Sequence, residues 1–340
     1  MKTVIDRVDR GLIKSELTPG KFLRPTNKAQ NEIYIITAHD SPNIMREIGR
    51  LRELSYRSGG GGSGNELDTD KYDFMENPYK QLIVWDPQSE EIVGGYRFLS
   101  GADVQLDEKG QPKFVMAYFF NFTKKFIEEY MPYTIELGRA FVQPDYQTTK
   151  MGMKSLFALD NLWDGLGALI HSVKDSKYFI GKVTVYENFP LVARELIYEY
   201  MNKHFKDPEQ LLVPYSPVTV SEKNIALAKT IFIHDNPADD YKLLIKAIRN
   251  EGENIPGMFN AYLTLTDTIK VFGTIQDHEF GSIYDTGMMV IMDDLHENKR
   301  QRYIQPYIEY LRKFMDEKKA ARKLRREQKA SLRTSRRKKK

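Results

Sequence analysis

The sequence predicts an α/β domain built on a mixed β-sheet with helices on its faces. Segments rich in β-branched and aromatic residues alternate with segments whose apolar residues recur every three to four positions. Two of the strand-like segments are joined by a short polar turn, which is typical of a hairpin. Of the 340 residues, 41% are hydrophobic and 12% are aromatic, so the chain can fill a sizeable core.

The first half of the domain begins with a strand at 31–38. An amphipathic helix at 41–57 follows, with Ser41 and Pro42 as start signals and an arginine-rich outer face. A glycine run at 59–64 separates this helix from a hairpin whose strands we expect at 81–86 and 92–100. A short helix is predicted within 120–132, where Pro132 ends it.

The second half alternates strands and helices in the same manner. Strands are predicted at 134–144 and 178–186, with a long apolar helix at 154–173 between them. The last third adds helices at 191–205 and 241–252 and strands near 271–275 and 287–295. We therefore predict an N-terminal arm at 1–30, one body at 31–315 that is extended from about residue 205, and a basic tail at 316–340.

Charge is distributed unevenly along the chain. The formal net charge is +4, yet residues 318–340 hold 13 Lys or Arg and one acid, Glu327, so the rest of the chain is acidic. Disorder or a solvated helix end is the default for such a tail. It is also suited to an anionic membrane surface, an acidic protein or RNA.

Several features bear on location. The chain contains no cysteine, which suits a reducing compartment, and its N-terminus lacks the apolar centre of a signal peptide. No segment has the roughly 18–20 apolar residues that a membrane span needs. We expect a cytoplasmic protein, with at most a peripheral contact at the inner face of the membrane.

The glycine run is open to several interpretations. Its composition is that of a flexible linker. It does not fit a dinucleotide-binding turn, because a helix precedes it, or a P-loop, because Asn65 and Glu66 follow Gly64. The acidic stretch after it lacks the glycine and the final glutamate of an EF-hand. A mobile, solvated loop and a loop beside a ligand both remain open.

The segment ELGR, residues 136–139, poses a geometric question. On a regular strand Glu136 and Arg139 point to opposite faces. Gly138 between them indicates a β-bulge, which would bring both side chains towards one cleft. The structural alternative is a buried ion pair.

No nucleophile or metal site is evident in the sequence. There is no G-x-S-x-G or H-E-x-x-H motif, and the six histidines lack the spacing of metal ligands. We therefore expect chemistry that needs no bound metal and no covalent enzyme intermediate.

These segments together resemble a known family. LRELSYR, ELDTDKYD, QLIVWD, GGYRFL, TIELGRAFVQPDYQ, IPGMFNAYL and DHEFG are similar to segments of the ornithine N-acyltransferase-like branch of the GNAT superfamily. They also resemble acyl-homoserine-lactone synthases. The match covers about 31–300, and ELGR followed by FVQPDYQ is its most specific part. Within the branch, the glycine-rich loop and the DNLWDGLGALI helix look most like bacterial glycine N-acyltransferases, some of which carry the label hemolysin.

The resemblance implies a GNAT-like acyl-CoA N-acyltransferase fold with a splayed pair of strands. It implies transfer of a long-chain, often 3-hydroxylated, fatty acyl group from the phosphopantetheine thioester of acyl carrier protein to an amino-acid amine in aminolipid synthesis. Glycine is the expected acceptor and ornithine the alternative. No cofactor would be permanently bound, and acyl-CoA is the alternative donor. The glycine run would then be a loop over the active-site cleft.

The resemblance also assigns roles to residues. Glu136 would be the general base, and Arg139 would orient it or bind a carboxylate. Substrate-binding roles would fall to the following residues: Arg50, Arg52, Arg57, Asp68, Asp70, Tyr72, Asp73 and Arg97. Residues at the acyl and pantetheine groups would be Phe141, Val142, Gln147 and Gly152. The pyrophosphate-binding pattern starting at Gln147 has Lys150 in place of its first glycine, which favours a carrier-protein donor over coenzyme A.

Two other classes of function stay open at this point. One is an acetyltransferase that uses acetyl-CoA and a small-molecule acceptor. The other is a non-catalytic membrane- or RNA-binding module that acts through the basic tail. The tail has no aromatic residue on which a base could stack, so specific recognition of nucleic acid is not expected.

Overall fold

The computed structural model describes residues 1–148 and 152–337. Its centre is an eight-stranded sheet in the order β1-β2-β3-β4-β6-β7-β10-β9, and β5 and β8 form a separate pair. The strands are β1 Phe22–Pro25, β2 Glu32–Ile36, β3 Lys80–Asp86, β4 Glu91–Ser100, β5 Phe120–Phe122, β6 Thr134–Val142, β7 Tyr178–Val185, β8 Leu212–Pro214, β9 Lys270–Asp277 and β10 Ile283–Ile291. The predicted α/β fold with a mixed sheet is confirmed.

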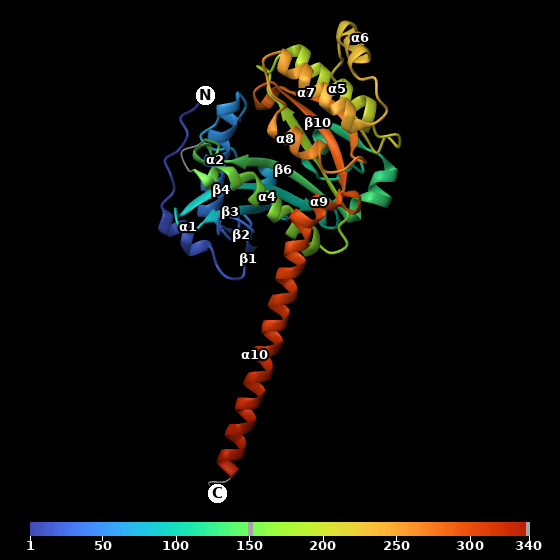
Figure 1. Cartoon of the computed structure of the whole chain (residues 1–340). Helices are drawn as coiled ribbons and strands as arrows, with labels where there is room; N and C mark the ends of the chain where they lie inside the picture. The colour runs from blue at the N-terminus through green and yellow to red at the C-terminus, as the bar shows by residue number, and fades with distance from the viewer. Residues whose placement is uncertain (149–151, 338–340) are drawn as a thin grey trace.

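All the helices except the long α10 lie around this sheet (Figure 1). The helices are α1 Arg10–Glu16, α2 Pro42–Gly59, α3 Lys71–Phe74, α4 Met153–Ser172, α5 Leu191–Phe205, α6 Glu222–Ile231, α7 Pro237–Asn250, α8 Gly257–Leu263, α9 Glu297–Lys299 and α10 Gln305–Arg337. Start signals explain several of their bounds, because Pro42 opens α2 and the Ser221 side chain accepts a hydrogen bond from Asn224 N at α6.

The sheet changes direction once among its main ladders, between β6 and β7. The other ladders of the eight-stranded sheet are antiparallel, whereas β6 and β7 are parallel. Their pairing is limited to Thr134–Glu136 against Tyr178–Ile180. Beyond these three pairs the two strands diverge, so the middle of the sheet opens towards their carboxyl ends. This is the splayed strand pair that the resemblance implied.

Because side chains alternate along each strand, the two faces of the sheet pack against different helices. Leu82 and Val84 of β3 belong to the apolar cluster that includes Leu162 and Leu166 of α4. Ile83, between them, belongs to the cluster that includes the apolar side of α2. Farther along that second face, the sheet is covered by an aromatic cluster formed largely by residues 114–131. Helix α4 and helix α2 therefore lie on opposite faces.

The N-terminal arm at 1–30 is integrated with the body. It contains α1, and β1 extends the sheet by pairing with β2. The backbone N–H of Lys2 also donates to the carbonyl of Gly64 at 2.8 Å, so the start of the chain lies against the end of the glycine run.

The tail differs in part from its expected disorder. Helix α10 runs from Gln305 to Arg337 and projects away from the body (Figure 1). Side chains from Leu311 to Arg325 are exposed. The Ala, Lys, Arg, Glu and Leu content favours a helix although there is no core to bury, which is the solvated helix end that the composition also allowed.

One predicted helix is wrong in its first part. Within 120–132, residues Phe120–Phe122 form β5, which pairs with β8, and the chain turns helical over Phe126–Tyr130. The alternation of buried Phe120, exposed Asn121 and buried Phe122 is compatible with a strand. The strand forms because this segment pairs with Leu212–Pro214, which is distant in the sequence.

Candidate active site

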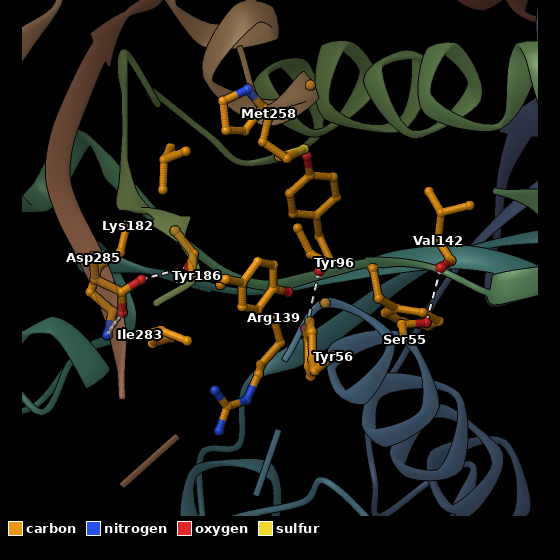
Figure 2. Close-up of a pocket in the computed structure, with 18 of the residues that line it drawn as sticks. Ser55, Tyr56, Tyr96, Arg139, Val142, Lys182, Tyr186, Met258, Ile283 and Asp285 are labelled. Atoms are coloured by element: carbon orange, nitrogen blue, oxygen red, sulfur yellow. Dashed lines mark hydrogen bonds and ion pairs between the residues drawn. The ribbon is translucent and has the colours of Figure 1, made fainter. Parts of the chain in front are cut away.

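A cavity of about 770 Å³ lies where β6 and β7 separate. Strands β6 and β7 supply its central walls, α2 and the glycine run close one side, and α4 and α8 close another. Figure 2 shows side chains from these elements converging on it. The cavity is lined from both faces of the sheet, because no strand pairing closes the gap between β6 and β7 at this point.

The register of strand pairing divides the cavity lining into a polar half and an apolar half. Leu99 of β4 pairs with Glu136 and Glu136 pairs with Ile180, so Arg97, Glu136 and Lys182 share one face of the sheet. Val183 lies on the other face, beside Ala158 of α4. The cavity thus joins charged groups on the α2 face to an apolar wall on the α4 face.

Glu136 is 2% exposed and is held by three donors. The Tyr79 hydroxyl and Val115 N (3.1 Å) donate to Oε2, and Met116 N donates to Oε1 at 2.8 Å. Burial raises the pKa of Glu136, although these hydrogen bonds and Arg97 oppose the rise. A buried carboxylate with a raised pKa that borders the cavity can exchange a proton with a bound group.

The predicted bulge is present in β6. The pairing with β4 shifts between Gly95 and Arg97, and Arg139 adopts a positive φ of 50°. The Arg139 guanidinium lies 4.3 Å from the centre of the Phe280 ring, and its Nε lies 3.0 Å from Asp68 Oδ2. Both Glu136 and Arg139 line the cavity. Because Arg139 pairs with Asp68, Glu136 is oriented by Tyr79 and the 115–116 backbone.

A network of paired charges lies behind the polar half. Arg97 Nη1 donates to both oxygens of Asp70 at 2.8 Å and lies 3.4 Å from Asp73 Oδ1. Arg52, which is fully buried, lies 3.4 Å from Asp73 Oδ2 and also donates to Gln81. Arg97 borders the cavity, while the other members of the network support it from behind.

The remaining substrate-binding candidates lie outside the cavity lining. Arg50 pairs with Glu47 beside the N-terminal arm, and Arg57 donates to Glu53 at 2.7 Å and to the carbonyls of Lys2 and Asn65. The helix therefore turns both arginines away from the site. Tyr72 packs edge-on against Tyr79, with ring centres 5.8 Å apart.

The glycine run is an ordered loop of the body, so its interpretation as a linker is wrong. Gly60 ends α2 in the left-handed conformation. The Glu53 carboxylate accepts from Ser63 N at 3.0 Å and Gly64 N at 2.8 Å. Gly59 borders the cavity, and a β-carbon there would lie 2.6 Å from the Tyr186 ring. Glycine thus permits close packing between the end of α2 and Tyr186, the residue that follows β7.

The acyl-binding candidates fall into two groups. Phe141, Val142 and Gln147 border the cavity, and Gln147 Nε2 donates to the Val142 carbonyl at 2.5 Å. Gly152 precedes α4 with a positive φ of 56°, outside the lining. Lys150, which breaks the pyrophosphate-binding pattern, lies outside the described residues.

Some lining residues had no signal in the helix and strand patterns. Ser55 and Tyr56 of α2 donate to the carbonyls of Val142 and Ala140, at 2.9 and 3.1 Å, and hold the free part of β6 (Figure 2). Lys182 Nζ of β7 lies 2.6 Å from Asp285 Oδ2 of the neighbouring strand β10. A charged residue inside a buried strand is the only signal that sequence offers for Lys182.

Two comparisons with known proteins agree with this geometry. Residues 51–156 match the model of the Acetyltransferase (GNAT) domain family. A protein from Bacteroides thetaiotaomicron named Glycine N(alpha)-acyltransferase is 50% identical over 91% of this chain and 91% of its own length. One of the same name from Phocaeicola vulgatus is 47% identical over 91% of this chain and 94% of its own length. The chain belongs to this N-acyltransferase family.

As an N-acyltransferase of the GNAT type, the protein takes its acyl group from a thioester donor such as acyl-CoA. No solved structure matches the chain. Within residues 1–148 and 152–337, no group of three or more His, Asp or Glu side chains is placed to hold a metal ion. No helix in that described part is long and apolar enough to cross a membrane.

Proposed function

We propose that this N-acyltransferase moves a long-chain, 3-hydroxylated or plain, fatty acyl group from acyl carrier protein to the amine of glycine, as a step in aminolipid synthesis. The observation that carries the proposal is the cavity at the splay of β6 and β7, which joins an apolar wall to a charged one. The names of the two relatives support glycine as the acceptor.

The apolar wall supports a long acyl chain over an acetyl group. It is formed largely by Ala158, Leu159, Leu162, Val183 and Val185. An acetyl group would cover a small part of this wall, whereas each further methylene that leaves water contributes roughly 0.8 kcal/mol to binding. The thioester would lie at the splay, with the chain directed along α4.

The segment before α4 supports a carrier-protein donor. Coenzyme A needs a glycine-rich turn whose backbone N–H groups bind its pyrophosphate, and this chain retains Gly152 of that pattern but has Lys150 at the first glycine. The phosphopantetheine of acyl carrier protein lacks the adenosine end and has no need of the full turn. Acyl-CoA remains the alternative donor.

The charge network supports glycine over ornithine. The side-chain ammonium of ornithine would need a carboxylate of its own, and the acidic stretch was the candidate. Asp70 and Asp73 are paired with Arg97 and Arg52, and Asp68 is paired with Arg139. Each of these carboxylates already faces an arginine, so the stretch has little to offer a second ammonium.

The chemistry proposed is direct transfer. The neutral amine attacks the thioester carbonyl, backbone N–H groups at the β6 bulge stabilise the oxyanion, and the thiol leaves without an acyl-enzyme. Glu136 receives the amine proton, directly or through water, and Arg139 holds the acceptor's carboxylate. Tyr79 and Met116 N fix the Glu136 carboxylate for this role.

The exposed helix α10 supports a peripheral site of action. Its basic side chains between Leu311 and Arg325 face solvent, where they can approach the anionic inner face of the cytoplasmic membrane. We propose that the enzyme is cytoplasmic and approaches this surface, where a fatty acylated product would partition.

Mass spectrometry of lipids from a host that expresses the chain tests the proposal, with Glu136→Gln expressed in parallel. We expect a new N-acyl glycine that disappears in the variant. With purified enzyme, fatty acyl carrier protein should support turnover better than fatty acyl-CoA or acetyl-CoA. N-acyl ornithine, or a preference for acetyl-CoA, would overturn the assignment of acceptor or donor respectively.

A further inference from the structure

Two sequence motifs remain without a role in the proposed chemistry: IPGMFNAYL at 255–263 and DHEFG at 277–281. The fold brings both to the cavity, because Pro256 and Met258 border it from the start of α8, and Asp277 and Phe280 border it from the end of β9. Asp277 shares its face of the sheet with Asp285 and Lys182, as the pairing of β9, β10 and β7 shows. The DHEFG motif therefore adds a carboxylate to the polar half of the cavity.

Asp277 is only partly engaged by the protein. Its Oδ1 accepts from Glu279 N at 3.0 Å and caps the short turn His278–Phe280. Within the part of the chain that the structure describes, Oδ2 has no hydrogen-bond donor, since Lys182 Nζ lies 3.9 Å away. The residue is 8% exposed, and it borders the cavity. A nearly buried carboxylate oxygen is thus available to a ligand.

The charges around Asp277 leave it short of a cation. Lys182 Nζ lies 2.6 Å from Asp285, which also accepts from the Thr184 hydroxyl at 2.5 Å, so Asp285 has the closer contact with the ammonium. Two carboxylates share one lysine. Burial and Asp285 raise the pKa of Asp277, and Lys182 and Arg139 only partly oppose the rise. A bound cation would compensate the ionised form.

Arg139 supplies the opposite charge in the same space. Its guanidinium lies over the ring of Phe280, a member of the DHEFG motif, and its charge acts on Asp277. The cavity therefore places a cation from β6 and a carboxylate from β9 near one another. Figure 2 shows Arg139 projecting from the splayed strand, with Lys182 and Asp285 together on the neighbouring wall. Such a pair is complementary to a zwitterion, in which an ammonium and a carboxylate are one carbon apart.

We propose that Asp277 binds the ammonium group of the amino-acid acceptor through Oδ2, while Lys182 and Asp285 fix the surrounding charge and Arg139 holds the acceptor's carboxylate. This inference rests on the proposed function and adds the acceptor subsite to it. The ammonium bound here loses one proton to Glu136, directly or through water, before the attack. The C–N bond then forms, the C–S bond breaks, and the leaving thiolate takes the second nitrogen proton.

The test compares purified Asp277→Asn with the wild type and with the control Glu279→Gln, using glycine and ethylamine as acceptors. The Asn side chain keeps the Oδ1 cap, and Asp277→Ser offers a second variant with a capping oxygen. Glu279 is exposed and outside the cavity lining, so its variant removes a nearby carboxylate without touching the site. The charged groups that act on Asp277 are unchanged in all three variants: Lys182, Asp285 and Arg139.

We expect Asp277→Asn to raise the KM for both amines at least tenfold, the effect of losing one charge-assisted hydrogen bond. The kcat at saturating amine and the KM for the acyl donor should stay within about threefold. Arg139→Gln should raise the KM for glycine and spare ethylamine, which has no carboxylate. Glycine binding measured by saturation-transfer NMR should weaken in Asp277→Asn in the same proportion.

An unchanged KM and unchanged glycine binding in both Asp277 variants would overturn the inference, as would an equal loss in Glu279→Gln. These outcomes are separate from failure of the proposed function. A wild-type enzyme that acylates another amine and not glycine would overturn the assignment of glycine, and the Asp277 comparison would then be made with that amine.

Discussion

Replacement of Glu136 separates a catalytic role from a structural one. In Glu136→Gln the remaining oxygen can still accept from Met116 N at the 2.8 Å position, and the new amide group can donate to the Tyr79 oxygen. Val115 N keeps the Tyr79 hydroxyl as a partner, at 3.0 Å. Because the Tyr79 O–H loses its acceptor when the amide takes this position, we expect the free energy of unfolding to fall by roughly 1–3 kcal/mol.

Glu136→Ala should behave differently. Met116 N and the Tyr79 hydroxyl each lose the acceptor that Glu136 supplies, and an unsatisfied buried group costs roughly 1–3 kcal/mol. The two groups together give a loss of about 2–6 kcal/mol, to which the new cavity adds. The alanine variant is therefore a test of folding, and the glutamine variant is a test of chemistry.

The assay is urea unfolding of both variants, followed by turnover at saturating donor and acceptor. Glu136→Gln should be folded and slower by about 10² or more, the usual contribution of a general base. Wild-type turnover in a stable Glu136→Gln enzyme would refute the catalytic role and leave Glu136 as an anchor of residues 115–116. A glutamine variant as unstable as the alanine variant would refute the hydrogen-bond reasoning.

Three further predictions concern stability, the glycine loop and the tail. Burial raises the pKa of Asp164 from its usual 3.8 to about 6. The protonated carboxyl therefore stabilises the folded state below about pH 4, and this stabilisation is lost as the pH rises through 6. Asp164→Asn should remove up to about 3 kcal/mol of this pH dependence, measured by urea unfolding at a series of pH values. Gly59→Ala should lower kcat/KM and thermal stability, because the new β-carbon would lie 2.6 Å from the Tyr186 ring and overpacking costs roughly 1–3 kcal/mol. The control is Gly20→Ala, whose β-carbon would have no other atom within 4 Å, and it should resemble the wild type. Deletion of 318–340 should abolish binding to anionic vesicles at low salt and leave turnover of a soluble donor unchanged; equal sedimentation of both forms with the vesicles would contradict the role of the tail.

Local patterns predicted the long elements well. The apolar repeat that Ser41 and Pro42 introduce gives α2, and the periodicity after Pro190 gives α5 with the observed bounds. Gly138 indicated the bulge, because only a break in alternation can direct Glu136 and Arg139 into one cavity. These signals are encoded within a few residues, so the sequence alone conveys them.

The partners of charged side chains could not be predicted in this way. Arg50, Arg52 and Arg57 share one predicted substrate-binding role. In the structure Glu47 pairs with Arg50 and Glu53 pairs with Arg57, whereas Arg52 enters the buried network. Which carboxylate each arginine meets depends on how α2 is rotated against the sheet. That rotation follows from packing of its apolar side, not from the positions of its charges.

What the sequence by itself determined is the α/β class, the order of the main elements and, through family resemblance, an N-acyltransferase with Glu136 and Arg139 beside one cleft. Only the tertiary structure decided that the glycine run is a packed loop and that Asp277, Lys182 and Asp285 meet Arg139 in one cavity. The physical reason is separation along the chain: β6, β7, β9 and β10 are joined only when the sheet assembles, and register then selects which charges share a face.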